Sequence, residues 1–83
     1  MNWNDTEKAC ETLGDGWRLP TIEGLNILYQ NKVAIGGFAS DFYLSSTEFD
    51  GFNYVWVQDF TNGDQYGYWG KNYSAYVRAI RAF

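Results

Sequence analysis

This chain of 83 residues lacks the residue types on which several functions depend. It has no histidine and a single cysteine, Cys10. An internal disulfide is therefore impossible, and the usual ligand sets for zinc and haem are missing. Without a second thiol or a histidine base we expect no enzyme activity, no cofactor and no metal site. Cys10 falls on the apolar face of an expected helix, so we expect a buried, unreactive thiol.

Charge and hydropathy argue against two further classes of partner. The net charge is −4, and no run of lysine or arginine is available to neutralise phosphates, so we expect no nucleic-acid partner. No apolar stretch approaches the roughly 18 residues needed to cross a bilayer, so we expect no membrane insertion. A domain of this size buries only about 60 % of its unfolded surface, so its stability should be small.

Two helices are expected in the first third of the chain. Asn2 or Asn4 can cap the first helix, and Gly14 can end it, because glycine adopts a positive φ at low cost. Thr21 can cap a second helix over residues 22 to about 29. Both segments carry apolar residues at helical spacing, so each has one face that can pack.

Beyond Asn31 the apolar spacing changes from the period of a helix to the period of a strand. We expect strands near residues 42–46, 54–60 and 76–81, with residues 66–71 forming either a fourth strand or an ordered loop. Glycine-containing pairs such as Asn62-Gly63 mark the turns between them. Residues 1–83 are therefore predicted to form a single α+β domain, with two helices followed by a small twisted antiparallel sheet with long loops.

Aromatic residues are concentrated in the second half. Fourteen lie from Phe38 to Phe83, against three before Phe38. Rigid rings interleaved with small polar residues are typical of surfaces that bind other molecules. A sugar stacks its C–H face on such rings, and a protein partner can use the same rings as anchors. The alternative is that some of them, Tyr66 and Tyr73 especially, fill a small core within the loops.

Four blocks carry a family resemblance: Gly-Trp-Arg-Leu-Pro-Thr at 16–21, Leu-Ser-Ser-Thr-Glu at 44–48, Trp56 with Phe60, and Tyr-Val-Arg-Ala-Ile-Arg at 76–81. With these blocks the chain resembles the DUF1566 domain family, which is similar to the C-type lectin-like folds, including the formylglycine-generating-enzyme branch. The chain departs from the family pattern at Leu44, where members often have tryptophan, and at Gly24, where they often have glutamate.

The resemblance implies a non-catalytic recognition module. Members of the family occur in bacterial surface adhesins and in phage tail or receptor-binding proteins, and some look like targets of diversity-generating retroelements. It therefore implies an extracellular, cell-surface or virion location and a host cell-surface glycan or protein as partner, with a surface that can be hypervariable. The alternative is a structural or oligomerisation domain of a surface or virion protein.

The resemblance also implies which residues form the scaffold. We expect the two block tryptophans to lie in the core, and Glu48 to bond to one of the arginines or to nearby backbone. The expected scaffold residues are Trp17, Arg18, Glu48, Trp56, Phe60, Arg78 and Arg81.

The residues between the blocks are the candidates for ligand contact. If Trp56 and Phe60 face the core, alternation along the strand turns Val57 and Asp59 outward. The expected ligand-binding residues are Phe49, Asp50, Phe52, Asn53, Tyr54, Val57, Asp59, Gln65, Tyr66, Tyr68 and Trp69.

Lectin-like folds usually begin with a strand that pairs with the last strand. The sequence has no such strand before the first expected helix, so we expect the chain to be the C-terminal piece of a longer protein. The last strand, 76–83, would then present an unpaired edge, which favours pairing with another chain, for example in a homotrimer.

Overall fold

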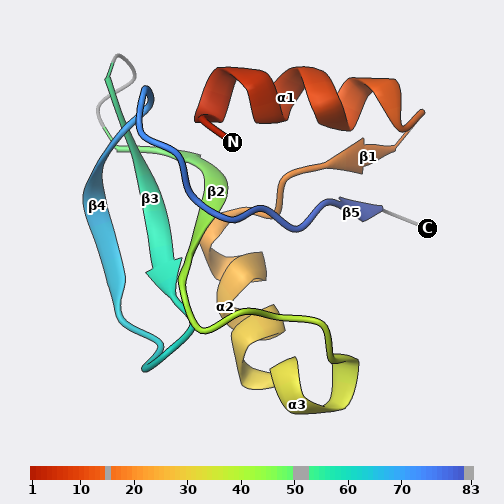
Figure 1. Ribbon diagram of the computed structural model, residues 1–83, viewed down its shortest axis with the longest axis vertical. Helices are drawn as coiled ribbons and strands as arrows, with labels where there is room; N and C mark the ends of the chain where they lie inside the picture. The colour runs from red at the N-terminus through yellow and green to blue at the C-terminus, as the bar shows by residue number, and fades with distance from the viewer. Residues whose placement is uncertain (15, 50–52, 82–83) are drawn as a thin grey trace.

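The structure is a computed structural model that describes residues 1–14, 16–49 and 53–81. Helices come first and the main sheet later, so the predicted α+β class is confirmed (Figure 1). The elements are α1 (Trp3–Thr12), β1 (Trp17–Arg18), α2 (Ile22–Gln30), α3 (Lys32–Ile35), β2 (Phe42–Glu48), β3 (Tyr54–Asp59), β4 (Gln65–Gly70) and β5 (Ile80–Arg81).

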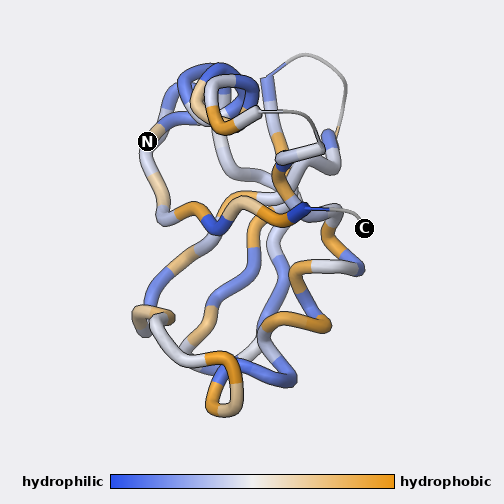
Figure 2. Tube along the Cα trace, turned by 90° about the vertical axis from the view of Figure 1, so that its right-hand side faces the viewer, coloured by the Kyte–Doolittle hydropathy of each residue, from blue (hydrophilic) through white to orange (hydrophobic). Residues whose placement is uncertain are grey.

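The strands form two antiparallel sheets. One has the order β2-β3-β4, and the other joins β1 to β5. Figure 1 shows α1 lying across one end of the molecule above the β1-β5 pair, with α2 and α3 toward the opposite end. In Figure 2 the chain is turned by 90°, and apolar positions recur along both the strands and α2. The molecule thus has a helical side and a sheet side.

Side-chain caps begin both predicted helices at the expected places. The Asn2 side chain accepts a hydrogen bond from the backbone N–H of Asp5 at 3.0 Å. Thr21 Oγ1 accepts one from the N–H of Gly24 at 3.1 Å. Gly14, with a φ of 113°, follows the end of α1. Such caps satisfy backbone groups that the helix itself leaves unpaired, so these local signals were sufficient to place both helices.

The segment that the sequence left as strand or loop is the strand β4. It carries a bulge, because Val55 pairs with Trp69 while Val57 pairs with Tyr66. Two residue steps on β3 are thus matched by three on β4. Val55 and Val57 share a face of the sheet, so Tyr66 and Trp69 share that face as well.

Both faces of the three-stranded sheet are covered. On one face, Phe60 packs in a cluster with Tyr43 from β2 and with Ile22 and Leu25 from α2. On the other face, a second cluster consists of Leu44, Val55 and Val57, and partly buried residues from α1, β2, β4 and the C-terminal segment pack against it: Trp3, Phe42, Trp69, Ala75 and Val77.

This double cover corrects one expectation. Val57 was expected to face outward, but its side chain is fully buried in the second cluster. Alternation along β3 is as expected, and Phe60 is buried on the opposite side. The error was the assumption that only one face of the sheet has a covering layer. Asp59 is half-buried and accepts a hydrogen bond from the N–H of Thr61 in the turn after β3.

The C-terminal segment differs from the single long strand that was expected. Within its described part, residues 76–81, only Ile80–Arg81 forms a strand, and it pairs with β1. Upstream, Tyr76 bridges to Tyr43, and Ala75 exchanges backbone hydrogen bonds with Met1 at 3.0 and 3.2 Å. Other parts of the chain therefore supply partners at these positions, although β5 has a strand neighbour on one side only among the described residues.

Other expectations have mixed outcomes. Cys10 is buried, as predicted, with 5 % of its surface exposed. Trp17 and Trp56 are only half-buried, although Trp56 packs against the first cluster. The short helix α3 was not predicted.

Over the residues that the structure describes, none of the helices has the length and apolar character needed to span a bilayer.

Candidate functional site

Exposed aromatic side chains in the described residues are confined to the sheet side of the chain. None lies before Phe49, although Trp3, Trp17 and Tyr29 are present there. Their exposed fractions range from 40 % for Tyr54 to 75 % for Tyr68. The exposed rings are Phe49, Tyr54, Tyr66, Tyr68, Tyr73 and Tyr76.

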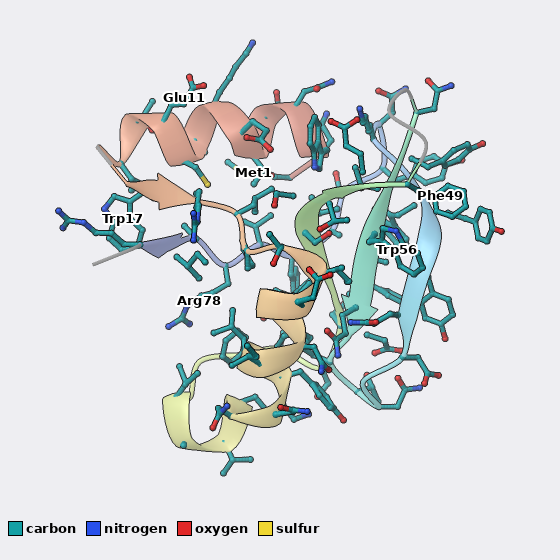
Figure 3. The ribbon with its side chains drawn as sticks, turned by 180° about the vertical axis from the view of Figure 1, so that it is seen from behind. Met1, Glu11, Trp17, Phe49, Trp56 and Arg78 are labelled. Carbon is teal, nitrogen blue, oxygen red and sulfur yellow. The ribbon has the colours of Figure 1, made fainter. Side chains whose placement is uncertain are left out.

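Three rings gather on one side of the β3-β4 hairpin, and we call Phe49, Trp56 and Tyr68 the aromatic face. The centroid of Phe49 lies 4.7 Å from that of Tyr68 and 5.8 Å from that of Trp56. Figure 3 shows Phe49 and Trp56 close together beside the sheet, with Trp17 and Arg78 well away from them. Gly67 is buried beneath this group. The bulge in β4 and a residue without a side chain together make room for the rings.

A second group lies on the opposite face of the sheet. The Phe42 ring is 5.1 Å from Trp69 and 6.0 Å from Tyr66, and Trp69 meets Tyr73 edge-on at 6.3 Å. The Tyr66 hydroxyl donates a hydrogen bond to Asp64 Oδ2 at 3.3 Å. Partial desolvation and then the negative charge of Asp64 raise the pKa of the Tyr66 phenol.

The expected ligand-binding residues are thus divided between two surfaces. Phe49 and Tyr68 lie on the aromatic face, whereas Tyr66 and Trp69 lie on the opposite side. Gln65 begins β4, where its side-chain amide lies 3.4 Å from Gln58 Oε1. Asn53 and Tyr54 are exposed at the start of β3, while Asp50 and Phe52 lie outside the described residues. The sequence did not reveal this division because it depends on the bulge.

Trp69 holds an unpaired donor. Its indole nitrogen is buried and has no hydrogen-bond partner among the described residues. By contrast, the indole nitrogen of Trp3 donates to the Ser45 carbonyl at 3.1 Å. A buried donor without a partner costs about 1–3 kcal/mol of desolvation. Among the described residues, the Trp69 side chain is thus held by packing, without a hydrogen bond from its indole nitrogen.

The ionic partner that the structure gives Glu48 is a lysine, where one of the arginines or nearby backbone was expected. Lys71 Nζ lies 3.5 Å from Glu48 Oε2 and 4.4 Å from the centre of the Trp3 ring. Arg78 lies over the Phe38 ring at 4.9 Å. Arg18 and Arg81 belong to the β1-β5 pair, and both are exposed. Lys71 was missed because it falls outside the motif blocks.

Titratable groups elsewhere on the described surface do not converge. Over residues 1–14, 16–49 and 53–81, no group of three or more histidine, cysteine, aspartate or glutamate residues is close enough to share an ion. Glu7 is half-buried, and its pKa is raised first by burial and then by the charges of Glu11 and Glu48. Burial and, to a smaller extent, Glu7 raise the pKa of the Cys10 thiol.

Comparison with known proteins adds no relative. No protein-family model matches the chain, and no curated protein is significantly similar to it. The surface described above is therefore the basis for a functional conclusion.

Proposed function

We propose that this chain is a non-catalytic recognition module with a C-type lectin-like fold of the DUF1566 type. It binds a host cell-surface glycan or protein through the aromatic face, and it is displayed outside the cell, on an adhesin or a phage tail fibre. The exposed part of this face consists of Phe49 and Tyr68, and half-buried Trp56 supports them.

One observation carries the proposal: two large exposed rings, Phe49 and Tyr68, pack together on one face of a well-packed scaffold. Tyr68 is 75 % exposed, yet its ring packs against Phe49 at 4.7 Å. Exposing a ring to water is unfavourable, and a packed cluster of exposed rings is typical of an interaction site. Rings already held by their neighbours lose little conformational entropy on binding.

The placement of the elements supports the lectin-like assignment. The late strand β5 returns to pair with the early strand β1, so an early and a late segment of the chain lie in one small sheet. The hairpin β3-β4 and its flanking segments project on the other side (Figure 1). A fixed frame with variable connections is the arrangement that a hypervariable display surface requires. Buried Val57 belongs to the frame, and we leave it out of that surface.

The experiment is a binding screen of the whole chain on an array of cell-surface oligosaccharides and on immobilised host-surface proteins. Tyr68→Ala removes the most exposed ring of the aromatic face and should weaken binding by about tenfold or more, the effect of losing a central aromatic anchor. Val33→Ala is the control, because Val33 is 91 % exposed on α3 at the far end of the molecule. Binding that is unchanged by Tyr68→Ala but lost in Val33→Ala would move the site to the helices.

A structural role is the second candidate, and the edge strand β4 favours it. In the described residues β4 has a strand neighbour on one side only, and its six residues carry no charge. Uncharged edges lack a common protection against pairing with another chain. Sedimentation equilibrium distinguishes the two roles: a trimer that Tyr66→Lys and Tyr68→Lys dissociate would support assembly, whereas a monomer that binds its partner supports recognition.

A further inference from the structure

A polar cleft opens where three distant segments of the chain meet. It has a volume of about 380 Å³, within the range of about 300–1,000 Å³ that is usual for small-ligand sites. Its side chains come from the first turn of α1, the start of β3 and the turn after β4: Asn4, Asn53, Tyr54, Lys71, Asn72 and Tyr73.

Backbone hydrogen bonds hold the three segments together. The N–H of Lys71 donates to the Asn53 carbonyl at 2.8 Å, and the N–H of Trp3 donates to the Lys71 carbonyl at 3.1 Å. The N–H of Tyr73 donates to the Gly70 carbonyl at 3.0 Å and closes the turn. The cleft is therefore formed before any ligand arrives, which lowers the entropic cost of binding.

The one formal charge in the lining is already compensated. Lys71 Nζ lies 3.5 Å from Glu48 Oε2 and over the Trp3 ring at 4.4 Å, and only 15 % of its side chain is exposed. An anionic ligand would have to compete with Glu48 for this ammonium group. The remaining lining side chains are neutral, so the cleft suits a neutral ligand.

The neutral groups offer paired hydrogen bonds and a ring surface. Within the described residues, the side-chain amides of Asn4 and Asn72 form no hydrogen bond with protein, and both residues are exposed. Each amide presents a donor and an acceptor, which matches two neighbouring hydroxyls of a sugar. Tyr73 is 66 % exposed, and its ring is held edge-on by Trp69 at 6.3 Å. A ring that is both fixed and exposed can stack on the C–H face of a pyranose.

We infer that this cleft binds a neutral saccharide unit, with Asn4 and Asn72 bonding its hydroxyls and Tyr73 stacking on its ring. The inference rests on the proposed role in recognition, but it uses residues outside the aromatic face, so the two can be tested separately.

The test is a titration of the whole ¹⁵N-labelled chain followed by NMR. The probes are the methyl glycosides of galactose, mannose and N-acetylglucosamine, with N-acetylneuraminic acid as the acidic comparator. We expect saturable shifts of the side-chain amide signals of Asn4 and Asn72 with at least one neutral glycoside. Asn72→Ala should weaken that binding about three- to tenfold and Tyr73→Ala about tenfold, whereas Tyr68→Ala should leave it unchanged.

Each outcome decides the inference. It is overturned if none of the neutral glycosides shifts these signals, if only the acidic sugar does, or if Asn72→Ala and Tyr73→Ala bind like the parent chain while their spectra show a folded protein. If Tyr68→Ala loses binding on the array and no neutral glycoside binds the cleft in the NMR titration, this inference is overturned and the proposed function is retained. The reverse pattern would retain the cleft and move recognition away from the aromatic face.

Discussion

Gly67 lies directly against the ring of Phe49. A Cβ atom added to Gly67 would be 2.5 Å from Phe49 Cδ2, closer than carbon atoms can pack, and 3.1 Å from Trp56 Cε2, which is tighter than most carbon contacts. Its φ is not in the left-handed region, so what requires glycine here is the neighbouring ring rather than the backbone conformation. The aromatic face is thus built on the space that this glycine leaves.

Replacing Gly67 with alanine should lower the free energy of unfolding by about 1–3 kcal/mol, because the Phe49 ring must move away from its neighbours. Urea denaturation followed by tryptophan fluorescence measures the change. Gly70→Ala is the matched control in the same strand, since its nearest ring atom would be 3.5 Å away. Adding Phe49→Ala should recover much of the loss. Equal effects of Gly67→Ala and Gly70→Ala would contradict the described contact.

Val57→Ala tests whether both faces of the three-stranded sheet are covered by packed residues. Since Val57 is fully buried against Leu44 and Val55, removing its two methyl groups should cost on the order of 2 kcal/mol of stability. The same substitution at Val33, which is 91 % exposed, should change stability by about 0.5 kcal/mol or less. Thermal unfolding of the two variants makes the comparison, and similar melting temperatures would refute burial at Val57.

The two tryptophans that differ in hydrogen bonding form another matched pair. Trp3→Phe removes the donor to the Ser45 carbonyl, whereas Trp69→Phe removes a donor that has no described partner. We expect Trp3→Phe to be the more destabilising of the two by about 1–2 kcal/mol. Denaturant titrations provide both values. A greater loss in Trp69→Phe would indicate that its indole nitrogen has a partner in solution.

The raised pKa of Glu7 predicts that the stability of the folded chain depends on pH. Burial first, and then Glu11 and Glu48, raise its pKa in the folded chain above the ordinary value of 4.5. A carboxyl with a raised pKa binds its proton more tightly in the folded chain than in the unfolded chain. Its contribution to folding stability is therefore complete below pH 4.5 and is lost as the pH rises through the raised pKa. Glu7→Gln should therefore be more stable than the parent chain at pH 7 and show little difference at pH 4. A stability difference between Glu7→Gln and the parent chain that is larger at pH 4 than at pH 7 would contradict the raised pKa.

Local signals in the sequence were enough to predict the helices α1 and α2, but not the short helix α3. Asn2 and Thr21 cap α1 and α2 by contacts within three residues, and Gly14 follows the end of α1. The alternation of side chains between the two faces of β3 could also be predicted from the sequence. These features depend on near neighbours in the chain, which the sequence displays directly.

Features that depend on residues far apart in the chain could not be predicted from the sequence. The burial of Val57 follows from a layer that includes Trp3 and Val77, each at least 20 residues away in the chain. The short strand β5 exists because β1 lies beside it, and the bulge in β4 decides which side of the sheet Tyr66 and Tyr68 occupy. The pair of Lys71 with Glu48 likewise needed the fold, because nothing in their spacing joins them.

The most direct test of recognition through the aromatic face is chemical-shift mapping of the ¹⁵N-labelled chain with the strongest binder from the array screen. We expect the largest backbone perturbations to include Phe49 and residues 66–69, and we expect Tyr68→Ala to abolish them. Perturbations centred on α2 and α3, or on Trp17 and Arg78 at the other side of the molecule (Figure 3), would contradict it.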